Sequence, residues 1–437
     1  MDWRDRYAEK LTTAEEAVRV VRDGDRVVIG MHYQTPLALC RALAARNGEL
    51  RCEIENSIST FVSWWPHGGR ESTFNVRTFF LQANDRPAMR QGRLDYVIAP
   101  PTRADDSYWL DRKPDVFLVS VSPPDGDGWC SFGMSVWGAP EVAREATHVI
   151  GEVNPRFIRT GGDNRIHISR IEALVEAPPV WKYLRRPPRD DEENAVTAVI
   201  CSLVGGEIVR DGDTLQMGTG TVSAALAEFL SHRHDLDVHS ELIFGGIPAL
   251  VDAGVVNGRR KTQHPGKVVG ASFGPLSAHE FAAVDGDPRY ELYCMSHTND
   301  IGVISAHDNM VAVNNALLVD VTGQINGETL GPEIYSGTGG AFAFSVGALH
   351  AKGGRSVTVL PSTSLVGGER RSRIVAMLPH GSAVTVPRVY ADIFVTEYGI
   401  ARLKGKPLRR RIDELIAIAH PDVRAELRAE ARQLYGA

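Results

Sequence analysis

Cysteines and long apolar runs are scarce in this chain of 437 residues. The five cysteines are scattered, odd in number and without CxxC spacing, which argues against a disulfide framework and against a zinc or redox site. No stretch of about 18 uncharged apolar residues occurs, and the charged N-terminus lacks the apolar run of a signal peptide. We therefore expect a cytoplasmic protein that does not associate with membranes.

An excess of positive charge is also missing. The net charge of -6 creates no basic surface of the kind that attracts nucleic acid. His232 and His234 lie in a polar segment without further ligands nearby, so we expect no metal site. A composition of 43% hydrophobic residues allows a large core, and the length fits two or three domains of ~100–200 residues each. The composition thus favours a small-molecule ligand.

An internal repeat is the main organisational feature. Residues 21–30 read VRDGDRVVIG and residues 209–218 read VRDGDTLQMG, at an offset of 188. In each copy an Asp-Gly-Asp turn leads into a short apolar strand, a small loop and a helix-like run, at 35–43 and at 223–230. Because this period is far too long for a solenoid, it predicts the duplication of a whole domain.

The segments between these motifs favour an α/β fold. Short β-branched runs at 148–153, 267–270 and 356–360 alternate with helical segments, as in parallel sheets covered on both faces. The charged, proline-bearing segment 185–194 is the best candidate for a linker, and a helix is expected over 195–208. We therefore predict two similar open parallel-sheet domains, residues 1–188 and 189–437.

Two glycine-rich loops of the second domain could hold a ligand. The first follows a predicted strand and opens a helix, where backbone N–H groups can face a phosphate or an oxyanion; it consists of Gly218, Thr219, Gly220, Thr221 and Val222. The second, at 336–340, permits close approach of backbone to ligand. Either loop alone could serve packing only, but two in one domain favour an acyl-phosphate or thioester ligand.

A single carboxylate lies between these loops. Glu241 follows His239 and Ser240 at the end of a predicted strand, and apolar residues and glycines come after it. A helix-capping, solvated glutamate is the ordinary alternative for such a position. A catalytic role is the second interpretation.

Taken together, these segments resemble the acetyl-CoA hydrolase/transferase family, in its 4-hydroxybutyrate, butyrate and acetate CoA-transferase branch. The matching stretches follow one another in order through nearly the whole chain. They are 122–125, 128–133, 152–155, 218–220, 239–241, 320–324, 335–340, 360–363, 395–399 and 419–421. The resemblance implies a pair of α/β domains with the active site in the cleft between them.

The resemblance also implies roles for individual residues. Glu241 would form a covalent thioester with CoA, and a carboxylate of ordinary pKa, near ~4.3, needs no base to make it a nucleophile. The oxyanion donors would be the backbone of Gly339 and Gly340 together with Asn299. CoA would be held by the loop from Gly218 to Val222, by the backbone around Leu317 and by Lys352.

The chain departs from the family pattern close to this site. Relatives usually have glutamine and aspartate at the positions of Ala341 and Ala343, and Ser-Asp-Gly where this chain has Phe244, Gly245 and Gly246. The side chains here are apolar or absent. We therefore expect a more apolar acyl pocket that uses acetate poorly.

Three functions remain open at this point. The chain could be a CoA-transferase acting on an acyl-CoA and a small carboxylic acid, a hydrolase that uses the same glutamate with water as acceptor, or a non-catalytic CoA-binding protein. In each case CoA is a substrate or ligand, with no permanently bound cofactor. We expect a homo-oligomer, either a dimer or a tetramer.

Overall fold

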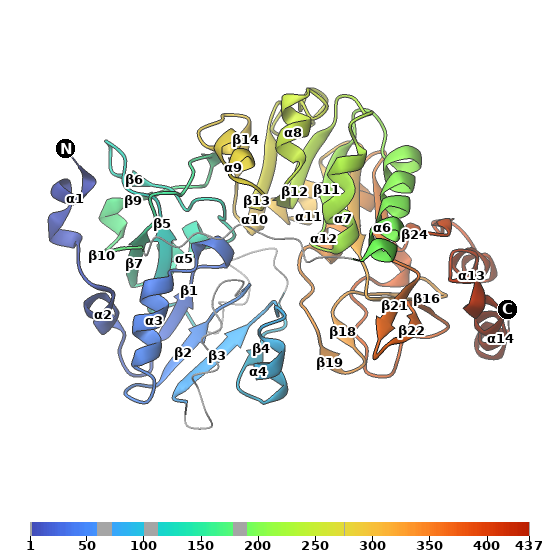
Figure 1. The fold of residues 1–437 in the computed structure, drawn as a ribbon, viewed down its shortest axis with the longest axis horizontal. Coiled ribbons are helices and arrows are strands. Elements are labelled where there is room, and N and C mark those ends of the chain that lie inside the picture. Colours follow the sequence, from blue (N-terminus) through green and yellow to red (C-terminus); the bar gives the residue numbers. More distant parts are fainter. Residues whose placement is uncertain (1, 59–71, 100–111, 178–189, 275, 437) are drawn as a thin grey trace. The chain divides into compact units, whose positions relative to one another are not determined.

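The computed structural model of the chain describes residues 2–58, 72–99, 112–177, 190–274 and 276–436 (Figure 1). The chain forms two compact units. Unit 1 comprises residues 1–183 and 270–297, and unit 2 comprises residues 184–269 and 298–437. The expected boundary at 188 and 189 therefore does not describe the path of the chain fully, since a later segment returns to the first unit.

Backbone pairing holds this returning segment in unit 1. Strand β14 (Tyr290–Leu292) pairs in parallel with β8 (Gly161–Gly162). The N–H of Phe273 donates to the carbonyl of Met134, and the N–H of Met295 donates to that of Trp137, both at 2.7 Å. These contacts join residues more than a hundred positions apart, so no local pattern could have predicted them.

Unit 1 is built on a parallel sheet with the strand order β10-β7-β5-β1-β2-β3-β4. The strands are β1 (Arg26–Ile29), β2 (Cys52–Glu55), β3 (Phe74–Thr78), β4 (Asp95–Tyr96), β5 (Val116–Val121), β7 (His148–Val153) and β10 (Ala173–Glu176). The predicted strand at 148–153 is confirmed. Every residue of β5 is buried, as expected for a strand covered on both faces.

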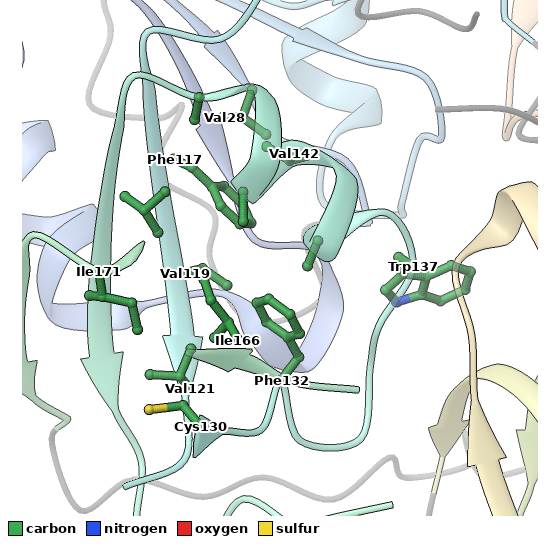
Figure 2. Close-up of a cluster of buried hydrophobic side chains, with 14 of the residues drawn as sticks. Val28, Phe117, Val119, Val121, Cys130, Phe132, Trp137, Val142, Ile166 and Ile171 are labelled. Atoms are coloured by element: carbon green, nitrogen blue, oxygen red, sulfur yellow. The ribbon is translucent and has the colours of Figure 1, made fainter. Parts of the chain in front are cut away.

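Helices and short strands complete unit 1. The helices are α1 (Trp3–Arg6), α2 (Ala14–Ala17), α3 (Leu37–Ala45), α4 (Arg86–Arg90), α5 (Ala139–Glu145), α9 (Ala278–Val284) and most of α10 (Met295–Thr298); the short strands are β6 (Trp129–Cys130) and β9 (Ile166–His167). Figure 2 shows Phe117, Val119 and Val121 of β5 within one apolar cluster that also contains Phe132 and Val142. This cluster forms part of the core of unit 1.

Unit 2 contains a second, mostly parallel sheet with the strand order β25-β24-β20-β15-β11-β12, in which only β25 is antiparallel to its neighbour among these described strands. The strands are β11 (Thr214–Met217), β12 (Asp237–Phe244), β15 (Met310–Asn315), β20 (Arg355–Val359), β24 (Ile393–Thr396) and β25 (Gly399–Arg402). The chain leaves unit 2 along β13 (Val268–Gly274).

Helices α6 (Asp191–Leu203), α7 (Thr221–Ala225), α8 (Ile247–Asp252), α11 (Ile301–Ser305), α12 (Ala341–His350), α13 (Leu408–Ala417) and α14 (Arg424–Tyr435) belong to unit 2. Small sheets are formed by β16 (Leu318–Asp320), β17 (Ile325–Asn326) and β23 (Ile374–Val375), by β18 (Thr329–Leu330) and β19 (Glu333–Ile334), and by β21 (Thr363–Val366) and β22 (Glu369–Ser372). Helix α12 packs on α11, β15 and β20 through a cluster that includes Phe344 and Ile304. No helix in the described part of the chain is long and apolar enough to cross a membrane.

The expected linker is wrong at its second half. Residues 185–189 lie outside the described residues, but 191–194 form the first turn of α6. The Asp190 side chain accepts from the N–H of Glu193, and the Glu193 carboxylate accepts from the N–H of Asp190, which is a capping box. The acidic run is therefore a helix start, stabilised by the positive end of the helix dipole.

The predicted repeat is present in both sheets. Gly24 and Gly212 both have positive φ, +84° and +82°, in the turn before the strand. The carboxylates of Asp25 and Asp213 each accept from the backbone N–H three residues earlier, at 2.8 Å and 2.6 Å. The two turns are thus the same structure 188 residues apart.

The loops after the repeated strands are alike as well. The hydroxyl of Thr35 donates to the carbonyl of Gly30 at 3.0 Å, and that of Ser223 donates to the carbonyl of Gly218 at 2.6 Å. The two donors lie 188 residues apart in the sequence, and so do the two acceptors. The two units therefore use one strand-loop-helix design.

The copies differ at one position of chemical interest. In unit 1, Glu53 of β2 lies opposite Arg26 of β1, and in unit 2, Asp237 of β12 lies opposite Thr214 of β11. Arg26 and Thr214 are equivalent in the repeat, so Glu53 and Asp237 are equivalent as well. Four residues further along the chain stand Ser57 in unit 1 and Glu241 in unit 2. Only the second copy has a carboxylate there.

Candidate active site

Strand β12 carries Glu241 in the middle of an otherwise buried run. Side chains alternate along a strand, so His239 and Glu241 share one face while Ser240 points to the other. Glu241 is the only one of the eight residues of β12 that is not fully buried. The predicted glutamate therefore lies in a buried strand as its one partly exposed residue, while its carboxyl group is buried.

The carboxylate of Glu241 meets the N-terminus of α12. The N–H of Gly340 donates to Oε2 of Glu241 at 2.9 Å. A Cβ at position 340 would lie 2.4 Å from the same oxygen, and Gly339 has a positive φ of +51°. Both positions therefore require glycine, one for close approach and one for conformation.

Asn299 is the second donor beside the carboxylate. The hydroxyl of Thr298 donates to Oδ1 of Asn299 at 2.9 Å, which fixes the direction of the amide. Nδ2 of Asn299 lies 3.1 Å from the point that a Cβ of Gly340 would occupy. This nitrogen is buried without a well-aligned hydrogen bond to any described residue, so it is available to a substrate oxygen.

His239 supports the segment that carries Asn299. Its Nε2 lies 2.9 Å from the carbonyl of Thr298; because a carbonyl only accepts, Nε2 carries the proton. The His239 ring lies against His307 and Phe344, with centroids 4.5 and 6.2 Å away. A chain of contacts thus runs from His239 through Thr298 to Asn299.

The pKa of Glu241 is raised above its ordinary value because the carboxyl is buried, while the hydrogen bond from Gly340 and the nearby amide of Asn299 lower it and only partly oppose this effect. Glu241 forms no ion pair with any described residue. The expectation of an ordinary pKa is therefore wrong. The carboxylate is held by neutral donors alone, which leaves it more basic than a solvated one.

The first glycine loop lies beside the glutamate. Continuing the parallel register of β11 and β12, in which Leu215 lies opposite Val238, brings Gly218 next to Glu241. Gly220 contacts the end of β15 so closely that a Cβ there would lie 2.0 Å from Cγ of Asn315. The loop from Gly218 to Val222 and Glu241 are thus brought together, although the role of the loop in holding CoA stays a prediction.

Leu317 lies just beyond the carboxyl end of β15, at the same edge of the sheet. Its N–H donates to the carbonyl of Asn326 at 2.8 Å, and its carbonyl accepts from Nε of Arg373 at 3.2 Å. Only the second lone pair of the Leu317 carbonyl is left for a ligand. Its contact with CoA stays a prediction.

Lys352 is not brought near the other candidate residues. It precedes β20, and its carbonyl accepts from the N–H of Asn309, the residue before β15. Its Nζ contacts Asp308 at 3.1 Å, and its side chain is 84% exposed. Lys352 therefore lies at the amino end of strands that are about 17–20 Å long, opposite the glycine loop.

The residues expected to shape the acyl pocket occupy two different environments. Ala341 is half-buried and directly follows Gly340, and Phe244 ends β12. Ala343 is only 2% exposed and packs in the cluster of α12 with Ile304. Ala341 can therefore face a substrate, whereas Ala343 belongs to the core.

Sequence reasoning missed three residues of this neighbourhood. The two-residue spacing of His239 and Glu241 on a strand could have indicated a shared face, and Thr298 adjoins the predicted Asn299. Nothing in the sequence marked His307. Its position depends on the folding of a distant segment against β12.

Models of two domains match the chain. The N-terminal domain of acetyl-CoA hydrolase/transferase matches residues 1–182, and the C-terminal domain of acetyl-CoA hydrolase/transferase matches residues 277–431. The 4-hydroxybutyrate coenzyme A transferase of Clostridium kluyveri is 37% identical, over 100% of both chains. The succinyl-CoA:cyclohexane-1-carboxylate CoA transferase of Geobacter metallireducens is 33% identical, over 98% of this chain and 96% of its own length.

Solved structures agree with these matches. RipA from Yersinia pestis superimposes with a TM-score of 0.90 at 30% identity, over 100% of both chains. The 4-hydroxybutyrate CoA-transferase from Porphyromonas gingivalis gives 0.78 at 30% identity, over 99% of this chain and 100% of its own. The α/β fold and the expected class of enzyme, a CoA-transferase, are confirmed by these similarities. The chain belongs to the acetyl-CoA hydrolase/transferase family.

Proposed function

We propose that this enzyme moves CoA from an acyl-CoA to a carboxylic acid through a thioester on Glu241. The observation that carries the proposal is the contact between Oε2 of Glu241, the one partly exposed residue of a buried strand, and the N–H of Gly340 at 2.9 Å. Asn299 adds a second neutral donor at the same place. A nucleophile flanked by two donors is the arrangement that acyl transfer requires.

The first half of the reaction loads CoA onto the enzyme. A carboxylate oxygen of Glu241 attacks the acyl carbonyl, the carbon–sulfur bond breaks, and CoA leaves as a thiolate from a mixed anhydride. The thiolate then attacks the carbonyl carbon of Glu241. The donor acid leaves as its carboxylate, and the glutamyl–CoA thioester remains.

The second half reverses these steps with a new acid. The acceptor carboxylate attacks the glutamyl thioester and releases CoA thiolate, which attacks the acyl carbon of the new anhydride. Glu241 is regenerated as a carboxylate and the acceptor leaves as its CoA thioester. Each addition passes through a tetrahedral oxyanion that Gly340 and Asn299 can stabilise.

CoA enters this cycle as a substrate, and the proposal includes no resident cofactor. The loops at 218–222 and 336–340 supply backbone donors on the side of the sheet from which Glu241 is reached. We place the enzyme in the cytoplasm, since its five cysteines are scattered and lack CxxC spacing. We also include a homo-oligomer in the proposal.

An apolar acid is the acceptor that the site favours. Ala341 directly follows the donor Gly340, and Phe244 lies three residues beyond Glu241 on β12; the family pattern has polar side chains in both segments. Relatives named for 4-hydroxybutyrate, cyclohexane-1-carboxylate and butyryl-CoA show that the family handles acids larger than acetate.

The first prediction concerns Glu241 itself. Glu241→Gln should abolish acyl exchange because an amide cannot form the thioester, while the fold persists. The raised pKa means that the ionised carboxylate destabilises the folded state at neutral pH, so the Tm of the variant should equal or exceed that of the wild type. Exchange is measured with an acyl-CoA plus a labelled acid.

The same assay separates the alternatives. CoA release from acyl-CoA without added acid would identify a hydrolase that uses water as acceptor, whereas a new acyl-CoA that appears only with acid identifies a transferase. Full exchange activity in Glu241→Gln would contradict the assignment of Glu241 as the nucleophile.

The second prediction concerns pH. Because Glu241 must be ionised to attack and its pKa is raised, kcat/KM should fall on the acid side with a midpoint above the ordinary value of 4.5. In Asn299→Ala, which loses a donor that lowers this pKa, the midpoint should move to higher pH. If the midpoint stays unchanged in this variant, the fall of kcat/KM at acid pH reflects the titration of a group other than Glu241.

The third prediction concerns the contact between Thr298 and Asn299. Asn299→Ala should lower kcat by about 100-fold or more, as for other oxyanion donors. Thr298→Val should lower kcat less, because the amide remains but loses its fixed direction, and Thr298→Ser should restore activity. In the Asn299→Ala background, Thr298→Val should have no further effect. Additive losses would show that Thr298 acts elsewhere.

The fourth prediction concerns the acceptor. Two additional buried methylenes contribute ~0.8 kcal/mol each, so kcat/KM for butyrate should exceed that for acetate by about tenfold. Ala341→Gln should reduce this preference while leaving exchange with acetate intact. Ala343→Asp is unsuitable as a companion, because it would bury a charge in the core. An equal or higher kcat/KM for acetate would contradict an apolar pocket.

A further inference from the structure

Arg373 is a positioned cation that the proposed chemistry does not use. It joins β22 to β23, its N–H donates to the carbonyl of Ser362 at 2.8 Å, and its carbonyl accepts from the N–H of Val319 at 2.9 Å. Its Nε donates to the carbonyl of Leu317 at 3.2 Å. Both the backbone and the guanidinium are therefore held in place.

The charge of Arg373 has no carboxylate partner within the described ranges of the chain, although arginines close to it in sequence do have one. Arg370 pairs with Glu192 at 2.7 Å, and Arg371 pairs with Glu369. The two terminal nitrogens of Arg373 make no hydrogen bond to a described residue. A partly buried guanidinium with free donors of this kind is suited to an anionic ligand.

The nearest acidic group is already engaged. Both carboxylate oxygens of Glu397 accept from Ser362, one from its N–H at 2.8 Å and the other from its hydroxyl. Burial lowers the pKa of Arg373, with Tyr335 and Glu397 opposing this effect. Arginine nevertheless stays protonated in proteins, so its positive charge persists.

The position of Arg373 fits the far end of a long substrate. Leu317, which holds it, lies beyond the carboxyl end of β15, and ligands of open α/β sheets bind at that edge. Tyr335 is near enough to act on the charge of Arg373, and it precedes the oxyanion donor Gly340 by five residues. Five residues span at most about 17 Å, so Tyr335 connects Arg373 with the neighbourhood of the oxyanion donors, while Arg373 is not among the groups that shift the pKa of Glu241.

We propose that Arg373 binds a phosphate group of CoA while the thioester lies at Glu241. This assignment rests on the proposed function. A monocarboxylic acceptor must place its only anionic group at Glu241, so it has none left for Arg373. CoA carries its phosphates at the end of an extended arm, away from the thiol, and they offer the oxygens that a guanidinium prefers.

The test compares Arg373→Met with Arg371→Met in the full-length enzyme. Arg373→Met should raise KM for acyl-CoA about tenfold or more, with kcat and KM for the acid nearly unchanged. With an acyl-pantetheine, which lacks the phosphates, wild type and Arg373→Met should give the same kcat/KM. Arg371→Met removes an exposed charge two residues away and should leave both KM values unchanged. Arg373→Lys should recover part of the lost affinity.

Several results would overturn the proposal. They are a rise in KM for the acid instead of acyl-CoA, an unchanged KM for acyl-CoA, an equal loss with acyl-pantetheine, or an equal effect of Arg371→Met. A measurement of Tm identifies any variant that fails to fold. If Arg373→Met does not fold, the KM of Arg373→Lys for acyl-CoA is used instead, and an unchanged value would overturn the proposal. Because the wild type must first show exchange that depends on Glu241, failure of the proposed function is seen separately.

Discussion

The site depends on one constraint, the burial of the Glu241 carboxylate without a cation. Burying a charged group costs free energy unless it is paired or hydrogen-bonded. Here the partners are the N–H of Gly340 at 2.9 Å and the nearby amide of Asn299. The rest of the neighbourhood follows from this need. Position 340 must be glycine so that the backbone can come this close, and the residue before it must tolerate a positive φ.

The duplicated architecture shows how little of the fold is needed to define the chemistry. The Asp-Gly-Asp turn and the hydroxyl of Thr35 or Ser223 recur with the same hydrogen bonds in both units. Ser57 stands in unit 1 where Glu241 stands in unit 2. The shared scaffold therefore supplies strands and loops of one design, while the proposed reaction depends on Glu241, which only the second copy carries.

Local patterns were predictable from the sequence, and long-range contacts were not. The strand at 148–153 and the repeat could be predicted because periodicity and turn residues act over short distances. Glu241 was expected at the end of a strand, but β12 continues to Phe244 because the apolar residues after Glu241 also pair in the sheet. The run at 191–194 was misread as linker, although its Asp-x-x-Glu spacing is a signal of a helix start. The return of 270–297 to unit 1, the distance of Lys352 from the loops and the direction of the pKa shift of Glu241 all depend on contacts between distant segments, which a single sequence does not display.

Neutral donors suit a reaction that exchanges one thioester for another. A lysine or arginine beside Glu241 would stabilise the resting carboxylate strongly and so make its attack harder, since only interactions that grow in the transition state accelerate a step. An N–H and an amide bind the carboxylate more weakly, yet they can follow the negative charge as it moves to a tetrahedral oxygen. The contact from His239 to Thr298, and the hydroxyl of Thr298 on Asn299, keep that amide directed at the same point throughout. Arg373 is not among the groups that shift the pKa of Glu241, so in the proposed role its positive charge contributes affinity for CoA without lowering the reactivity of the nucleophile.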